Sequence, residues 1–115
     1  MQATPTQQKW DGLIKRHGMR AALRSNGVDR PITVSIQAEN AVERLGAVSN
    51  PLDRVALVSA LDPDTGRMIN PPPTERDVLV AKTPEGTTLL FRIFAPPDRI
   101  GIDLVPLYWQ LKVRT

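Results

Sequence analysis

The chain has 115 residues, of which 41% are hydrophobic and 23% are charged, and it carries a formal net charge of +3. This size predicts one globular domain, residues 1–115, and the lack of cysteine excludes disulfides and thiolate metal sites. No apolar run approaches the roughly 20 residues of a membrane span, and the N-terminus lacks the apolar region of a signal peptide, so we expect a soluble chain made in the cytoplasm.

The first expected element is a short helix that starts at a Thr6 cap and ends near Gly18. One stripe of side chains has helical spacing and comprises Trp10, Leu13, Ile14 and His17. Gly18 suits the left-handed position that often follows a helix. We expect His17, the only histidine, to pack or to cap the helix rather than to act in catalysis.

After this helix the pattern changes to the alternation of apolar and polar residues that is typical of strands. Six segments are expected as strands, namely 19–25, 32–38, 53–61, 77–83, 87–95 and 105–115. The alternation predicts that 32–38 is buried on one face only, whereas the continuous apolar run 78–81 predicts burial on both faces. The expected fold class is mainly β: a small six-stranded antiparallel β-barrel or sandwich with a short N-terminal helix.

The connections between these strands are of two kinds. Asn26-Gly27 predicts a tight turn, and Pro84 with Gly86 predicts a short hairpin loop. Three connections are long, namely 39–51, 62–75 and 96–106. A long connection in a small domain is usually functional or mobile.

The closing strand has the clearest pattern in the chain. Its inward side chains are expected to be Leu107, Trp109, Leu111 and Val113. Its outward side chains are expected to be Tyr108, Gln110, Lys112 and Arg114. We expect this strand to pair back onto the sheet and seal an edge.

The sequence offers little material for catalysis. The glycines are scattered and form no phosphate-binding loop, and there is no nucleophile elbow. Asp62 and Asp64 flank Pro63 in what reads as a turn, with too few further ligands for a metal. We therefore expect no enzyme activity, no catalytic residues, no cofactor and no bound metal.

The positive charge is concentrated between residues 9 and 30, which carry six Lys or Arg and two Asp. One interpretation is a solvated helix and strand face, and the other is contact with an acidic partner or nucleic acid. Small barrels bind single strands through exposed aromatics among cations. Here Phe91, Phe94 and Trp109 are expected in the core, which leaves Tyr108 alone on a polar face.

The order of segments resembles a known family. "LIKRHG" precedes the basic strand "RAALRS", followed by "DRVALVSA", a proline-rich connection, "DVLVAKTPEGTTLLFRIF" and the terminal "DRIGIDLVPLYWQLKVRT". Over roughly residues 13–115 this is similar to the head–tail connector proteins of tailed bacteriophages, of the head-closure or stopper class. In "PPPTERD", Arg76 stands where that family often has glycine.

The resemblance implies a β-barrel subunit of a ring, six-fold in symmetry, in the virion neck and assembled in the host cytoplasm. Such a ring lies below the portal and its adaptor, retains the packaged double-stranded DNA and meets a tail-terminator or tail-tube protein, without membrane contact. The connection between the second and third strands points into the channel in related proteins. It corresponds here to 39–51, with candidate channel residues Glu39, Glu43, Arg44 and Leu45.

Docking between rings is the preferred interpretation of the basic segment, because arginine pairs bidentately with carboxylates. The candidate residues for this interface are Lys15, Arg16, Arg20, Arg24, Tyr108, Lys112 and Arg114. Three alternatives remain open from the sequence: a tail-terminator or adaptor subunit, a single-stranded nucleic-acid-binding barrel, and an assembly chaperone.

Overall fold

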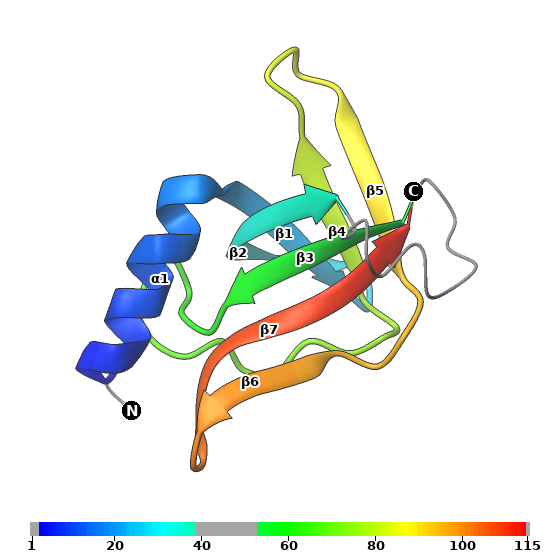
Figure 1. Ribbon diagram of the computed structural model, residues 1–115. Coiled ribbons are helices and arrows are strands. Elements are labelled where there is room, and N and C mark those ends of the chain that lie inside the picture. Colours follow the sequence, from blue (N-terminus) through cyan, green and yellow to red (C-terminus); the bar gives the residue numbers. More distant parts are fainter. Residues whose placement is uncertain (1–2, 39–52, 115) are drawn as a thin grey trace.

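A computed structural model describes residues 3–38 and 53–114. The chain is mainly β, with one helix near the N-terminus followed by strands that run antiparallel to their neighbours (Figure 1). The elements are α1 (Pro5–His17), β1 (Met19–Ser25), β2 (Val28–Ala38), β3 (Asp53–Ser59), β4 (Val78–Lys82), β5 (Thr88–Ile93), β6 (Asp98–Ile102) and β7 (Val105–Arg114). This confirms the predicted fold class.

Six strands close into a barrel in the order β3-β2-β1-β4-β5-β7, and β7 pairs back with β3. The closing ladder runs from Asp53 opposite Arg114 to Ser59 opposite Tyr108. The prediction that the terminal strand seals an edge is therefore confirmed. Closure removes the unpaired edges that make open sheets prone to association.

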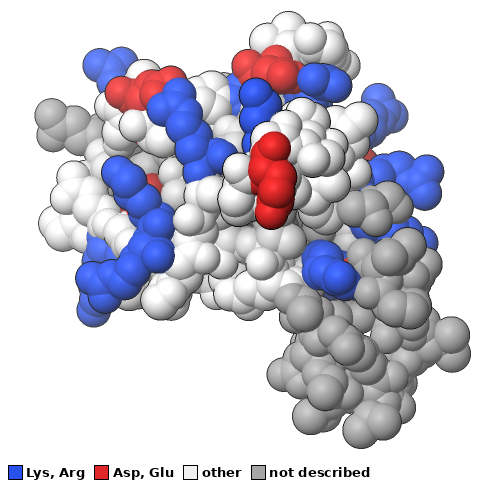
Figure 2. Space-filling model, turned by 90° about the horizontal axis from the view of Figure 1, so that it is seen from above, with Lys and Arg blue, Asp and Glu red and all other residues white. Residues whose placement is uncertain are grey.

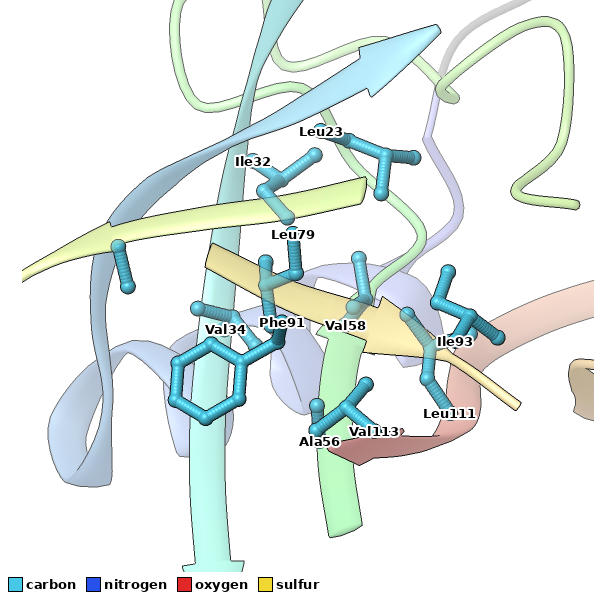
Figure 3. Close-up of a cluster of buried hydrophobic side chains, with 11 residues drawn as sticks. Leu23, Ile32, Val34, Ala56, Val58, Leu79, Phe91, Ile93, Leu111 and Val113 are labelled. Atoms are coloured by element: carbon cyan, nitrogen blue, oxygen red, sulfur yellow. The ribbon is translucent and has the colours of Figure 1, made fainter. Parts of the chain in front are cut away.

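The barrel core is built from aliphatic side chains that alternate along the strands. Leu23, Val34, Val58, Leu79 and Leu111 are fully buried and come from five different strands (Figure 3). Phe91 is the aromatic member of this cluster. All six strands of the barrel therefore contribute side chains to one core, as the alternation of inward and outward residues predicts.

A seventh strand, β6, lies outside the closed barrel and pairs only with β7. The sequence prediction of a loop over 96–106 was wrong for this part. The ladder shifts register between Ile100 and Gly101. A Cβ on Gly101 would collide with the backbone oxygen of Val105, so a larger residue could not approach the partner strand at this point.

The helix begins two residues earlier than predicted. Thr4, not Thr6, is the N-cap, and its side chain accepts from the backbone N–H of Gln7 while the Gln7 side chain accepts from the backbone of Thr4. Gln7 is almost fully buried and also donates to the carbonyl of Pro106, at 2.9 Å. The capping box thus fixes the start of the helix and attaches it to β7.

The predicted apolar stripe of the helix is only partly buried. Ile14 is 5% exposed and Trp10 is half-buried, whereas Leu13 and His17 are exposed. His17 does not pack into the fold, so that alternative was wrong, whereas the alternative that it caps the helix stays a prediction for this residue of the last turn. The helix attaches to the barrel through polar as well as apolar contacts, because buried Gln7 lies on the same side as Ile14.

Gly18 joins the helix to β1 in an extended conformation, not the left-handed one predicted. The glycine is required for a different reason. A Cβ at this position would collide with the backbone oxygens of Val34 and Ile14. Close approach of the helix end to β2 therefore selects glycine here.

Two predictions of strand burial were wrong. In β2 the polar residues Thr33 and Ser35 are buried along with Ile32 and Val34, because α1 packs against this strand. In β4, Leu79 and Ala81 of the run 78–81 are buried but Val78 and Val80 are only half-buried, as expected for a strand with one face toward the core. The helix covers β2, and no helix in the described ranges covers β4.

Both predicted tight connections are confirmed. Asn26 and Gly27 have positive φ angles of 53° and 79°, which fits the turn that joins β1 and β2. Gly86 also has a positive φ, of 89°, and its N–H donates to the carbonyl of Thr83 at 2.9 Å. These turns fix the register of the two hairpins.

Candidate interface surfaces

The basic segment on β1 is largely neutralised by acidic neighbours. Arg20 lies 2.7 Å from Asp64, and Arg24 lies 2.7 Å from Asp29. The hydrogen bond from Arg24 holds the pKa of the Asp29 carboxyl below its ordinary value. Figure 2 shows one face of the molecule, on which acidic side chains lie among the lysines and arginines. The segment is therefore not a continuous cationic surface of the kind that binds a phosphate backbone.

Three of the predicted interface residues are exposed cations without an ion pair in the described part of the chain. Lys15 and Arg16 lie in the last turn of α1, where positive charge is favourable next to the helix C-terminus. Lys112 projects from β7. These residues remain available for contact with an acidic surface.

Tyr108 is not free on an outer face. Its ring lies 5.2 Å from the ring of Trp10, at an interplanar angle of 39°, so the helix covers this part of β7. The contact is an aromatic pair of favourable tilted geometry. The polar face of β7 therefore contacts α1 near the start of the strand.

Arg114 closes the other end of the same strand. Its Nε donates to Asp53 Oδ1 at 2.6 Å and its Nη2 donates to Oδ2 at 3.1 Å, a bidentate pair between β7 and β3. The hydrogen bond to Asp53 raises the pKa of Arg114. Phe94 lies under the guanidinium, 4.4 Å from its carbon to the ring centroid, and is 37% exposed. The prediction of Phe94 as a core residue was wrong, because this ring packs against Arg114.

The four candidate channel residues lie outside the described residues, as does the whole connection 39–51. The strands on either side of that connection are β2 and β3, and they pair with Ala38 opposite Arg54. The described ends of the connection are therefore adjacent. The candidate channel residues are Glu39, Glu43, Arg44 and Leu45.

A cleft that was not predicted from the sequence lies between the β3–β4 connection and the β6–β7 pair. Its volume is about 540 Å³, and Met68, Ile69 and Trp109 form part of its apolar lining. Arg67 and Arg99 also line it, and both are exposed without an ion pair in the described residues. The indole Nε1 of Trp109 is buried and has no hydrogen-bond partner in that same part of the chain. The cleft combines apolar surface with uncompensated positive charge.

The β4–β5 hairpin extends beyond the barrel (Figure 1). β4 pairs with β1 only through residues 78–80, and β5 pairs with β7 only through Arg92 and Ile93. Residues 82–90, which we call the hairpin arm, therefore pair only within the β4–β5 hairpin, with Lys82 opposite Thr88 and Leu90 opposite Val80. Leu90 is 51% exposed, and Glu85 at the turn is exposed without an ion pair in the described residues. A two-stranded hairpin without further contacts is marginally stable in water.

The described residues lack two other kinds of site. They contain no group of three His, Cys, Asp or Glu side chains that could hold a metal ion. None of the helical residues described forms a segment long and apolar enough to cross a membrane.

Comparisons with protein-family models, with curated proteins and with solved structures found no match to this chain. The geometry of the surfaces is therefore the basis on which a function is proposed.

Proposed function

We propose that this chain is a ring-forming head–tail connector subunit of a tailed bacteriophage, of the class that closes the DNA-filled head. The observation that carries the proposal is a closed barrel with two incomplete extensions, the hairpin arm and β6. The barrel satisfies the backbone of its own strands, whereas these two extensions have edges that lack a partner in the described residues. Such edges are completed by a neighbouring molecule in an assembly.

The exposed apolar side chains favour the same conclusion. Leu104 is 90% exposed, Ile102 59% and Leu90 51%, and all three lie on or next to the two extensions. Single exposed apolar residues are ordinary on a protein surface, but these coincide with unpaired strand edges. A ring subunit needs two different surfaces of this kind, because each copy contacts one neighbour on either side.

The charge distribution favours a channel ring over a nucleic-acid-binding barrel. Strong binding to DNA requires a run of cations that are free to neutralise phosphates. On the predicted basic strand, β1, Arg20 and Arg24 are already paired with carboxylates, and the exposed cations without an ion pair in the described residues lie elsewhere, on α1, on β7 and in the cleft lining. Stacking of bases requires exposed aromatics, and Trp10 and Tyr108 pack against each other. Double-stranded DNA could then slide through the open ring without binding to the channel wall.

In this proposal six copies form a ring in the virion neck, below the portal and adaptor and above a tail-terminator or tail-tube protein. Lys15, Arg16 and Lys112 are the exposed cations available for an acidic rim of a neighbouring ring. In the head-closure proteins that the chain resembles, the connection between the second and third strands faces the channel and retains the DNA, and by position it corresponds here to 39–51, outside the described residues. A tail-terminator or adaptor subunit is the alternative within the same assembly.

Deletion of the coding sequence in the phage or prophage that carries it tests the function. We expect filled heads that assemble but lose DNA and attach no tails, visible by electron microscopy. Tailed, DNA-retaining particles from the deletion strain would contradict the proposal. A salt titration against single-stranded DNA separates the rival class, because a binder loses affinity log-linearly with salt, whereas this protein is expected to bind weakly at every salt concentration.

A further inference from the structure

The hairpin arm and the cleft lie at opposite ends of the molecule. Figure 1 shows the β4–β5 hairpin at one end and β6, which contributes Arg99 to the cleft, at the other. A contact between these two surfaces within one chain is therefore excluded. A contact between copies joins the arm of one subunit to the cleft of the next, which is the head-to-tail arrangement that generates a ring when the rotation closes.

The chemistry of the two surfaces is complementary. The cleft has an apolar lining that includes Met68 and Ile69, and it carries the two exposed arginines described above. The arm has exposed Leu90 and exposed Glu85. The apolar lining fits a leucine side chain, and a cleft of about 540 Å³ has room for more than one side chain. The carboxylate of Glu85 at the turn supplies the negatively charged partner that the two arginines lack in the described residues.

We propose that the hairpin arm of each subunit docks into the cleft of its neighbour, with Glu85 facing Arg67 and Arg99 and Leu90 on the apolar lining. This inference rests on the ring of the proposed function and specifies its subunit contact. Docking covers the free edges of the arm and buries the exposed apolar side chains at both ends. It also makes assembly directional, because the two surfaces differ.

A charge exchange tests the pairing. Arg99→Glu alone and Glu85→Arg alone are each expected to weaken self-association by roughly tenfold or more, because like charges then face each other across the contact. The double variant with both changes is expected to recover most of that loss. Val28→Ser is the matched control for Leu90→Ser, because Val28 is 64% exposed but lies at the β1–β2 turn. Leu90→Ser should weaken association, and Val28→Ser should not.

The chain has no native cysteine, so the contact can also be trapped directly. Glu85→Cys combined with Arg99→Cys is expected to give a ladder of disulfide-linked oligomers on a non-reducing gel. Either single variant can give only dimers. The combination of Glu75→Cys with Arg99→Cys is the control, because exposed Glu75 lies in the β3–β4 connection and not on the arm. Circular dichroism of each variant checks that it is folded.

The outcomes separate the two proposals. Oligomers that form normally in both charge variants and give no cysteine ladder overturn the arm-and-cleft contact but leave the ring intact. A wild-type chain that stays monomeric at every concentration, measured by sedimentation, overturns both. Loss of duplex-DNA binding in Arg67→Glu and Arg99→Glu with unchanged self-association would assign the cleft to nucleic acid and overturn the contact.

Discussion

The barrel and its two extensions differ in how their strands are completed. Each strand of the barrel has partners on both sides, and its inward side chains are excluded from water, as Leu111 and Val58 illustrate. The hairpin arm pairs only within the β4–β5 hairpin, and β6 pairs on one side only. The barrel is therefore stabilised within the chain, whereas the extensions present backbone and apolar surface that a second molecule can cover.

The largest effect on stability is expected inside the barrel. Leu111→Ala, at a side chain that is 0% exposed, should lower the free energy of unfolding by about 2–5 kcal/mol through lost burial and a cavity. Leu104→Ala is the matched control, since the same change at a 90% exposed leucine should alter it by no more than about 0.5 kcal/mol. Urea unfolding of both variants measures the difference. Equal losses would contradict the division between barrel and extension.

The junction between helix and barrel should respond next. Gly18→Ala places a Cβ against the backbone oxygen of Val34 and is expected to destabilise the fold by about 1–3 kcal/mol. Gly12→Ala has open space around its Cβ within the helix and should stabilise it by about 0.5–1 kcal/mol. Thermal unfolding monitored by circular dichroism measures both. A gain in stability from Gly18→Ala would show that the close approach is not tight.

The ion pair that joins β3 and β7 should have an intermediate effect. Arg114→Ala removes both hydrogen bonds to Asp53 and the cation over the ring of Phe94. We expect a loss of stability smaller than that of Leu111→Ala. Lys112→Ala, at an exposed neighbour on the same strand, is the control and should change little. The unfolding midpoint in urea distinguishes the two, and identical midpoints would indicate that the ion pair contributes nothing.

The smallest effect is expected at the exposed pair of Arg24 and Asp29. Because the pKa of Asp29 is lower in the folded chain than its ordinary value of 3.8, the pair contributes stability above that value and loses it as the pH falls through the lower folded value. The melting temperature of Asp29→Asn should therefore lie slightly below that of the wild type at neutral pH. The difference should shrink on acidification toward about pH 2. A difference that grows on acidification would have the wrong sign.

The sequence predicted the barrel better than the surfaces. Strand 105–115 and the tight turns follow from local pattern, and the turn glycines at 27 and 86 have the positive φ angles that the turns require. By contrast, β6 has exposed residues at both ends and an interrupted ladder, so it shows no alternation and forms because β7 is present as its partner. Tertiary contact, not local preference, decides such a segment.

The candidate interface could be predicted in composition but not in pairing. The cations on β1 were found from the sequence, but their carboxylate partners were not, because Arg20 meets Asp64 from a distant connection. The cleft could not be predicted for the same reason, since Arg67 belongs to the β3–β4 connection and Arg99 to β6, and only the fold brings them together. Residues that are far apart in the chain carry no common local pattern. Only the topology reveals them.

Amide hydrogen exchange as a function of assembly tests the central claim most directly. In dilute protein, amides of β2, β3 and β7 should exchange slowly, and those of the hairpin arm should exchange quickly. On assembly the arm and β6 should become protected, while the barrel should change little. If the arm is as protected as the barrel in the monomer, and unchanged at high concentration, the account of a complete barrel with extensions completed by neighbouring subunits is wrong.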